Sequence, residues 1–309
     1  MQITHGFTSS NGPCALTIGN FDGLHLGHLA LLEKLKAEAS VRGLPTCVLT
    51  FEPHPREFFS PAQAPTRLTS LREKAELLQV TGVDRLHVLR FNQALASLSP
   101  DAFIERALVK TLGARWVLVG DDFRFGARRA GDFDLLKAAG NRHGFETEFL
   151  PTVTVEGVRS SSTAVREALA EGDMDKAARL LGRPYSITGR VFHGDKLGRS
   201  IGFPTANIQL RHNRPPLSGI YVVEVWGINS TPLQGAASLG VRPTVRKDGR
   251  PTLEAFIFDL DRDLYGQRLR VDFLKKLRDE EKYPDLPSLV AQIELDVTNA
   301  KSFFAGRHG

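Results

Sequence analysis

An apolar strand, a glycine-rich turn and a helix follow one another near the N-terminus, and this order constrains the fold more than any other feature. An apolar run ending at Ile18 predicts a buried strand, and apolar residues spaced three and four apart predict a helix over 28–42. Gly19 and Gly23 lie between them, where glycine permits a tight turn without steric cost. A helix that starts after such a turn presents N–H groups and a positive dipole end, which suits a phosphate group.

Two histidines, His25 and His28, lie three residues apart at the start of this helix. Both side chains can donate hydrogen bonds to a phosphate and to the charge that develops on it during transfer. The alternatives are a structural histidine pair or two ligands of a metal site, and no further ligands occur at a spacing typical of zinc. The position between a strand and a helix favours phosphate binding.

Apolar segments and helical patterns alternate through the first half of the chain. Four more strand-like segments lie at 46–51, 85–91, 115–120 and 145–150, with helical patterns at 70–80, 100–112 and 132–143. Such alternation predicts a parallel sheet covered by helices, and sheets of this kind bind ligands beyond the carboxyl ends of their strands.

Three further segments of this half lie directly after predicted strands. The two prolines of 51–55 predict either a rigid turn or part of a binding site. The segment 120–126 contains Asp122, which could orient a ribose, hold a histidine or only form a turn. The serines of 159–166 predict a helix N-cap. Arg166 lies in the first turn of that helix, where the dipole disfavours a cation unless an anion is nearby.

The overall composition is that of an ordinary globular protein. The 309 residues are enough for two domains, and no apolar run approaches the ~20 residues that span a bilayer. The N-terminal residues do not have the pattern of a signal peptide, so we expect a cytoplasmic protein, with Cys14 and Cys47 as buried, reduced thiols.

The net charge of +5 favours anionic partners such as nucleotides. The basic residues are scattered, without a long basic tail or an aromatic-rich RNA-binding motif. We therefore expect small-molecule substrates, no nucleic-acid partner, no membrane partner, and a monomer or weak homo-oligomer. A basic RNA-binding protein is the alternative that the charge alone leaves open.

The pattern of the chain changes after a short predicted helix at 173–181. Gly182-Arg183-Pro184 ends this helix, which predicts two domains, 1–182 and 183–309. Six short strands follow at 185–192, 203–208, 220–226, 233–239, 252–260 and 267–273, and a helix at 286–304. Short, evenly spaced strands of this kind predict a barrel or a sandwich.

Three features of this second half indicate a site for phosphate chemistry. The loop that begins at Gly194 contains three glycines and two cations, which predicts either a phosphate cradle or an ordinary hairpin loop. Thr205 and Asn207 follow on one face of a strand, and their oxygen atoms suit Mg²⁺. Glu254 shares a strand face with two phenylalanines, as a base beside a flat aromatic ligand would, although a solvated glutamate is the commoner case.

These motifs resemble those of a known family. The segment Gly19-Asn20-Phe21-Asp22-Gly23-Leu24-His25-Leu26-Gly27-His28 is similar to the signature of the flavin-adenylylating nucleotidyltransferases, the N-terminal half of prokaryotic bifunctional riboflavin kinase/FAD synthetases. Segment 120–126 is similar to the family's Gly-x-Asp-Phe-x-Phe-Gly, and 161–166 to its Ser-Ser-Thr-x-x-Arg. Pro204-Thr205-Ala206-Asn207 resembles the riboflavin kinase motif.

The resemblance implies a Rossmann-like N-terminal nucleotidyltransferase domain with a parallel sheet. It also implies a C-terminal six-stranded antiparallel β-barrel with a terminal helix. The barrel would phosphorylate riboflavin with ATP to FMN, and the N-terminal domain would join FMN to AMP from a second ATP, giving FAD and pyrophosphate. The resemblance also implies Mg²⁺ as the cofactor, bound together with ATP. A nucleotidyltransferase acting on pantetheine or nicotinamide nucleotides is the alternative from the N-terminal motif, but the barrel motif argues against it.

The resemblance also implies roles for individual residues. The catalytic set is Glu254, His25, His28 and Arg166; the nucleotide-binding set is Gly19, Phe21, Asp22, Gly23, Gly27, Asp122, Ser161, Ser162, Thr163, Gly194, Gly198 and Arg199; the flavin-binding set is Phe123, Phe125 and Arg278; and the metal ligands are Thr205 and Asn207. Three residues depart from the kinase pattern, with Ser238 in place of asparagine, Phe256 in place of histidine and Val245 in place of phenylalanine.

Overall fold

The computed structural model describes residues 1–8, 12–194, 198, 201–210, 214–240 and 251–307. Two compact units divide the chain: the first is Met1–Pro65 with Leu71–Ser161, and the second is Thr66–Ser70 with Ser162–Gly309. The segment 162–181 is therefore counted with the second unit. The domain boundary after residue 182, which concerns where the chain can be divided into working parts, stays a prediction.

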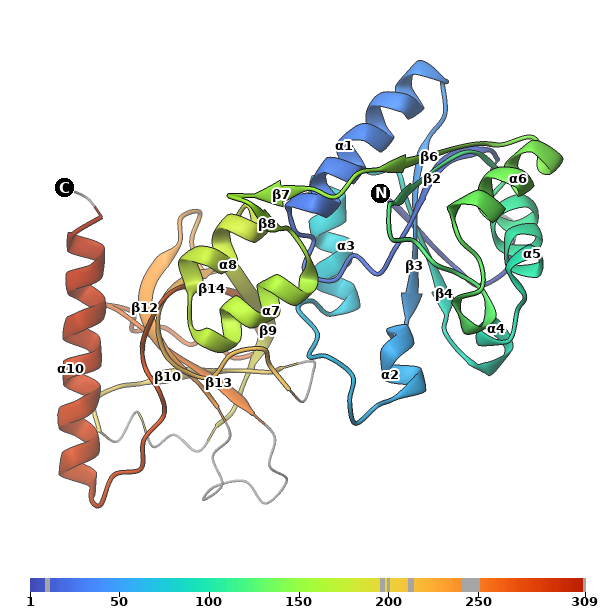
Figure 1. Cartoon of the computed structure of the whole chain (residues 1–309). Coiled ribbons are helices and arrows are strands. Elements are labelled where there is room, and N and C mark those ends of the chain that lie inside the picture. Colours follow the sequence, from blue (N-terminus) through green and yellow to red (C-terminus); the bar gives the residue numbers. More distant parts are fainter. Residues whose placement is uncertain (9–11, 195–197, 199–200, 211–213, 241–250, 308–309) are drawn as a thin grey trace. The chain divides into compact units, whose positions relative to one another are not determined.

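A six-stranded sheet in the order β1-β4-β3-β2-β5-β6 forms the centre of the first unit (Figure 1). Its strands are β1 (Gln2–His5), β2 (Cys14–Ile18), β3 (Thr46–Glu52), β4 (Arg85–Arg90), β5 (Ala114–Gly120) and β6 (Glu146–Leu150). Every neighbouring pair is parallel, which confirms the predicted parallel sheet. The edge strand β1 was not predicted, because its sequence Gln-Ile-Thr-His has a single apolar residue.

Helices cover both faces of this sheet. They are α1 (Leu26–Val41), α2 (Pro55–Phe59), α3 (Leu71–Val80), α4 (Gln93–Ala96), α5 (Pro100–Phe103), the π-helix η1 (Ile104–Thr111), the short 3₁₀ turn η2 (Ala127–Arg129) and α6 (Phe133–His143). Leu35 of α1 and Leu78 of α3 belong to one buried cluster, and Leu108 of η1 and Leu136 of α6 to another. The helix predicted over 100–112 is thus α5 continued as a π-helix.

The order of the strands reverses beside β2. The chain leaves β2 for β3 and β4 on one side through α1 and α3, and it returns to place β5 on the other side. In sheets of this class, ligands bind in the crevice at the carboxyl ends of the strands where the order reverses. The loops that follow β2 and β5 border this position, and they carry the two motifs predicted from the sequence.

The second unit contains a closed antiparallel barrel in the order β10-β13-β12-β11-β14-β9, which confirms the predicted six-stranded barrel. The helices and strands described in the second unit are α7 (Ser162–Glu171), α8 (Met174–Leu181), β9 (Tyr185–Phe192), β10 (Thr205–Ile208), β11 (Gly219–Trp226), β12 (Leu233–Gly240), β13 (Thr252–Ile257), β14 (Arg268–Arg278) and α10 (Leu286–Ala305). Alternate residues of each strand fill the interior.

The helix α10 packs against the outer face of the barrel (Figure 1). Ala300 and Phe304 of α10 are buried with Val222 of β11 and Ala236 of β12. This packing buries part of the outer barrel surface and gives the second unit a core outside its barrel as well as one inside.

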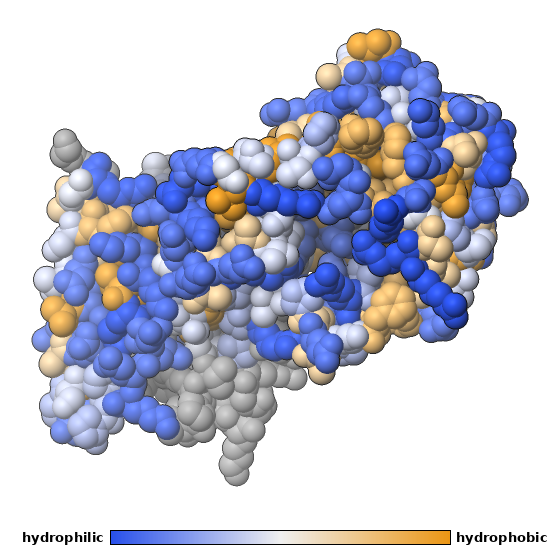
Figure 2. Space-filling model, in the orientation of Figure 1, coloured by the Kyte–Doolittle hydropathy of each residue, from blue (hydrophilic) through white to orange (hydrophobic). Residues whose placement is uncertain are grey.

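The surface drawn in Figure 2 is mostly polar, with apolar residues in small groups among charged ones. No helix in the described parts of the chain is long and apolar enough to cross a membrane. Cys14 and Cys47 are both buried and neither forms a disulfide, as predicted.

Candidate active sites

The loop between β2 and α1 folds back into the core of the first unit. Phe21 and Leu24 have φ angles of 48° and 44°, in the left-handed region that non-glycine residues rarely adopt, and their side chains are fully buried. Gly23 has a φ angle of 82°. A Cβ atom at Gly19 would lie 3.1 Å from the ring of Phe21, so a glycine there lets the ring pack beneath the loop. The loop therefore has a defined shape set by its own buried side chains.

His25 and His28 stack on each other at the start of α1. Their ring centroids are 3.7 Å apart at an interplanar angle of 26°, and the ring of His28 also contacts Phe21 at 4.9 Å. His25 is buried with 7% of its surface exposed. The two histidines that were predicted to act together thus lie in contact, and the ring of Phe21 packs against His28.

Ser160, which the sequence analysis did not select, completes this cluster. Its Oγ accepts a hydrogen bond from the N–H of Gly27 at 3.1 Å and lies 3.3 Å from Nδ1 of His25. The N–H of Gly27 is therefore engaged within the protein, whereas the sequence analysis expected an open helix N-terminus. Ser160 is only one of three consecutive serines in the sequence, and nothing in their pattern indicates which of them meets the histidine.

A two-stranded hairpin delivers Ser160 to this position. It consists of β7 (Thr154–Val155) and β8 (Val158–Arg159), joined by Glu156 and Gly157 with φ angles of 51° and 79°. Two successive positive φ angles are typical of the tight turns that fit the twist of a hairpin. The backbone N–H of Ser160 then donates to the carbonyl of Val153 at 2.9 Å, which holds the end of the hairpin.

Asp121 and Asp122 follow β5 and have separate partners. Asp122 forms an ion pair with Arg159 at 2.6 Å, and both side chains are at least half exposed. Asp121 accepts hydrogen bonds from the hydroxyl and the N–H of Thr152 at 2.7 and 3.0 Å. The hydrogen bond from the Thr152 hydroxyl lowers the pKa of Asp121. Both contacts tie the loop after β5 to the segment that precedes Ser160, and a nucleotide contact by Asp122 stays a prediction.

Phe123 and Phe125 belong to a larger set of phenylalanines whose rings are in contact. Their rings lie 5.3 Å apart at 18°, and Phe125 contacts Phe103 at 5.8 Å. Further ring contacts of 6.5 Å or less connect, in order, Phe103, Phe51, Phe91, Phe58 and Phe59. We call these seven residues the aromatic row.

The aromatic row lies where strands end. Phe51 is near the end of β3, Phe91 follows β4, and Phe123 follows β5. Phe59 has 63% of its surface exposed, so one end of the row reaches solvent. Sequence reasoning selected only Phe123 and Phe125, because the other five are distant in sequence and the parallel sheet alone brings them together. Flat apolar rings at the carboxyl edge of a sheet can hold a planar aromatic ligand.

Ser162, Thr163 and Arg166 lie on the first turns of α7, within the second unit. The Nε atom of Arg166 donates a hydrogen bond to the carbonyl of Thr66 at 2.6 Å, and the side chain is half-buried. A guanidinium carries five N–H donors and a permanent positive charge. The roles predicted for these three residues stay predictions.

Strand register brings together the candidate residues of the barrel. Glu254 on β13 is paired with Asn207 on β10 and with Ser238 on β12, so the three side chains share one face of three adjacent strands. The hydroxyl of Thr205 lies 3.5 Å from Oε2 of Glu254. This face is the outer one, because the alternate residues Leu253 and Ala255 are buried inside the barrel.

Two glycines allow the loop before β10 to pass close to this face. A Cβ atom at Gly194 would overlap the side-chain amide of Asn207. One at Gly198 would overlap the carbonyl of Phe203 and lie 3.4 Å from the hydroxyl of Thr205. Thr205 and Asn207 carry oxygen atoms of the kind that Mg²⁺ prefers, and a Mg²⁺ site usually has few protein ligands and is completed by phosphates. A metal at this position stays a prediction. Two residues named from the sequence, Arg199 and Val245, lie outside the described residues.

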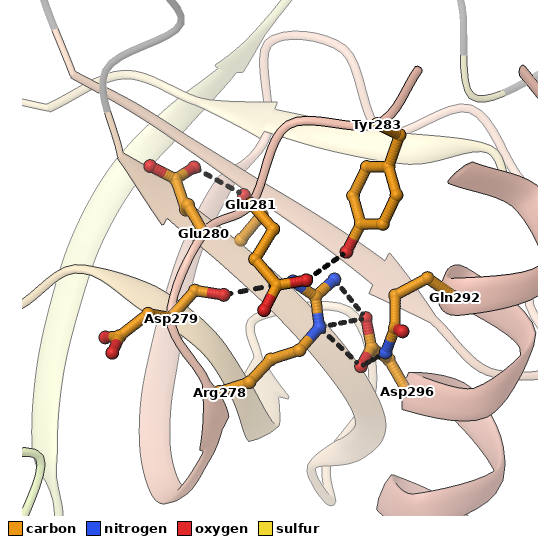
Figure 3. A network of polar contacts seen from close by, with 8 residues as sticks. Arg278, Asp279, Glu280, Glu281, Tyr283, Gln292 and Asp296 are labelled. Carbon is orange, nitrogen blue, oxygen red and sulfur yellow. Dashed lines mark hydrogen bonds and ion pairs between the residues drawn. The ribbon is translucent and has the colours of Figure 1, made fainter. Parts of the chain in front are cut away.

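The strand β14 ends in a network of polar contacts that includes Arg278 (Figure 3). Arg278 binds the carboxylate of Asp296 on α10 through two nitrogens, at 2.7 to 3.2 Å, and Gln292 donates to the same carboxylate at 3.1 Å. The side chains of Arg278 and Asp296 are 18% and 7% exposed. Removing one partner of such a buried pair costs about 3–5 kcal/mol. In this structure Arg278 fastens β14 to α10, and a flavin contact by it stays a prediction.

Ser238 is held by the segment that follows Arg278. Its hydroxyl donates to Oε1 of Glu280 at 3.3 Å. The carboxylate of Glu280 fills the space that a side chain at Gly240 would need. The residue that departs from the kinase pattern therefore has a local partner, and it connects the face with Glu254 to the segment between β14 and α10.

Comparisons with known proteins match both halves of the chain. Residues 7–164 match the family model described as FAD synthetase, and residues 181–304 match the one described as riboflavin kinase. The chain is 49% identical to the bifunctional riboflavin kinase/FMN adenylyltransferase of Pseudomonas fluorescens over 301 residues, which is 97% of this chain and 96% of that protein. It is 50% identical to the protein of the same description from Escherichia coli strain K12 over 291 residues, covering 94% and 93%.

A solved structure has the same fold over nearly the whole chain. It is a crystal structure described as a macrolide-efflux protein from Streptococcus pneumoniae, with a TM-score of 0.81, 30% identity, and coverage of 96% of this chain and 97% of that one. Its description applies to that protein, and what it shares with this chain is the fold. The two family models and the relatives that match over nearly their whole length indicate the same family. The chain therefore belongs to the bifunctional riboflavin kinase/FMN adenylyltransferase family.

Proposed function

We propose that this chain phosphorylates riboflavin with ATP to give FMN, and then joins FMN to AMP from a second ATP to give FAD and pyrophosphate. The observation that carries this proposal is the presence of two separate sites in one chain. The stacked pair of His25 and His28 lies at the carboxyl edge of a parallel sheet, and Glu254 lies among oxygen donors on a barrel. Each site falls in the part of the chain that matches the corresponding family model.

In the kinase reaction, Glu254 acts as the base. It takes the proton of the 5′-hydroxyl of riboflavin as that oxygen bonds to the γ-phosphorus of ATP and the bond from phosphorus to the β-γ bridging oxygen breaks. Thr205 and Asn207 would hold Mg²⁺, which neutralises charge on the ATP phosphates. Gly194 and Gly198 lie close to Asn207 and Thr205, so the chain that carries these glycines would lie near the same phosphates and could act as a phosphate cradle.

In the adenylyl transfer, a phosphate oxygen of FMN attacks the α-phosphorus of ATP, and pyrophosphate leaves. This nucleophile is already an anion, so the reaction depends on positioning and charge stabilisation rather than on a base. His25 and His28 donate hydrogen bonds to the charge that develops at the α-phosphate, and Arg166 supplies a positive charge. The aromatic row, with Phe123 and Phe125 at one end, would hold the flavin ring by stacking.

The remaining expectations follow from this chemistry. The substrates are ATP, riboflavin and FMN, with Mg²⁺ bound to ATP, and the partners are small molecules rather than nucleic acid or a membrane. We place the protein in the cytoplasm, where ATP is available, as a monomer or weak homo-oligomer.

An assay of flavin products tests the proposal. The protein is incubated with riboflavin, ATP and Mg²⁺, and the flavins are separated over time. FMN should appear first and FAD later, supplied FMN should give FAD directly, and EDTA should stop both steps. A folded sample that makes neither FMN nor FAD would contradict the proposal, and one that makes only FMN would contradict its adenylyl-transfer half.

A further inference from the structure

The contact between Ser160 and His25 has a consequence for the proton on the histidine ring. A serine hydroxyl has one hydrogen to donate and two lone pairs that accept. The N–H of Gly27 donates to the Ser160 oxygen at 3.1 Å, and Nδ1 of His25 lies 3.3 Å from the same oxygen. Ser160 and His25 are buried, with 5% and 7% of their surfaces exposed. The three groups therefore form a chain of contacts away from bulk water.

The direction of the hydrogen bond between Ser160 and His25 depends on which ring nitrogen carries the proton. Gly27 is a fixed donor to the serine oxygen, so the serine hydrogen can point toward Nδ1. A neutral imidazole that accepts at Nδ1 carries its own hydrogen on Nε2, which then remains a donor. In a protonated imidazole, Nδ1–H donates to the serine oxygen, and Nε2–H is again a donor. The opposite neutral tautomer has a bare Nε2, which repels a phosphate oxygen.

Because the two histidines stack, the neutral form of the imidazole has to be considered. Two positive charges at the 3.7 Å separation of the His25 and His28 rings would repel each other strongly. A pair with one neutral ring avoids this repulsion, and the tautomer of a neutral ring decides whether its Nε2 can donate. Gly27 also makes the contact possible, because a Cβ atom there would lie 3.1 Å from both Nδ1 of His25 and the carbonyl oxygen of Ser160.

We propose that Ser160 is a positioning residue for adenylyl transfer, whose hydroxyl connects the Gly27 N–H to Nδ1 of His25 and keeps the His25 proton on Nε2. The inference rests on the proposed function, since it assigns Nε2–H as the donor to the transferring phosphate. Ser160 itself does not contact the reacting atoms in this account, because its hydroxyl acts through the imidazole.

The test combines Ser160→Ala, Ser160→Thr and the matched variant Ser99→Ala. Ser99 also accepts a hydrogen bond from a backbone N–H, that of Ala102 at 3.2 Å, in the same unit. In Ser160→Ala, kcat for FAD formation from supplied FMN should fall roughly 10–100-fold with little change in KM for ATP, as is typical when a partner that orients a functional histidine is removed. FMN formation should not change, Ser160→Thr should recover most of the rate, and Ser99→Ala should retain the wild-type rate.

The tautomer of His25 is the direct readout. In protein labelled with ¹⁵N at histidine, with the His25 signals identified by their loss in His25→Ala, wild type and Ser160→Thr should show hydrogen on Nε2. Ser160→Ala should show a mixture with bare Nε2. The tautomer is measured without any reaction taking place. If the wild type makes no FAD, the proposed function fails, and the measured tautomer still tests this inference.

Three outcomes overturn the inference. One is a bare Nε2 in the wild type, which can be measured even if Ser160→Ala does not fold. Another is an unchanged tautomer in Ser160→Ala. The last is a loss of rate in Ser160→Ala that is matched by Ser99→Ala at the same fall in melting temperature, since both would then reflect loss of a structural hydrogen bond.

Discussion

The two candidate sites are built in different ways. In the first unit, His25 meets Ser160 across 135 residues of sequence, and the loops that carry them are shaped by buried side chains and positive φ angles. In the barrel, Asn207, Glu254 and Ser238 meet through the register of adjacent strands. The loop site therefore depends on many distant contacts, whereas the barrel site depends on strand pairing. The residues of the barrel site can therefore be located in the sequence, because alternate residues of a strand lie on the same face.

Glycine has a related use in both sites. Gly19 and Gly27 leave room for Phe21 and His25 in the first unit, and Gly194 leaves room for Asn207 in the second. In each case the backbone comes close to a side chain that the proposed chemistry needs. The difference is that in the first unit the glycines make room for rings packed into the loop, whereas in the barrel Gly194 makes room for a side chain on the neighbouring strand β10.

The largest expected effect separates the sites chemically. Glu254→Gln keeps the size of the side chain and removes the base, so FMN formation should fall roughly 10²–10⁴-fold. FAD formation from supplied FMN should be unchanged, because Glu254 lies on the barrel and the proposed adenylyl transfer uses His25 and His28 of the first unit. Glu224→Gln, a half-buried glutamate on the outer face of β11, is the matched control. Near-wild-type phosphorylation of riboflavin by Glu254→Gln would mean that another group is the base.

The next effect is the converse. His28→Ala removes a donor to the transferring phosphate and should lower FAD formation roughly 10²–10³-fold while FMN formation is spared. His143→Ala, an exposed histidine near the end of α6, serves as the control. Rates of both reactions and a melting curve are measured for each variant. Equal loss of both activities at an unchanged melting temperature would show that the sites are not separate.

A smaller effect tests the close approach of the loop to the barrel face. In Gly194→Ala, the new methyl group displaces the side chain of Asn207, which can move without disturbing the core. FMN formation should fall up to about 100-fold, as misplacement by about 1 Å can cause. The melting temperature should change little. Gly306→Ala is the control, since its Cβ would lie 3.7 Å from the nearest atom. An unchanged kinase rate would argue against Asn207 as a ligand.

The smallest effect concerns the departure at Ser238. The hydroxyl of Ser238 donates to Glu280, and the amide of an asparagine can donate to the same carboxylate. Ser238→Asn should therefore preserve the kinase rate or raise it by up to about threefold. The fold should stay intact, because a substitution that keeps its local partner usually costs little stability. Steady-state rates at saturating ATP and riboflavin measure this. A large kinase loss with the fold intact would mean that this barrel has adapted to the shorter side chain.

The alternation of strands and helices was enough to predict the parallel sheet and the barrel. Edge strand β1 was missed because four residues with one apolar side chain have no usable pattern. The site in the barrel was largely accessible from sequence, since a strand places every second residue on one face and Thr205, Asn207 and Glu254 obey that period. In the first unit only the local motifs could be identified. The aromatic row joins residues from four separate segments, and no spacing in the sequence relates Phe59 to Phe123.

The sequence by itself determined what covalent geometry and local preference can determine. It set which segments are strands, where glycine permits a turn, and which side chains share a face, because these depend on residues a few positions apart. Only the tertiary structure decided which of three serines meets His25, that Arg278 binds Asp296 on α10, and that Glu280 fills the space beside Gly240. Those contacts join residues 18 to 135 positions apart, and their formation depends on how whole elements pack.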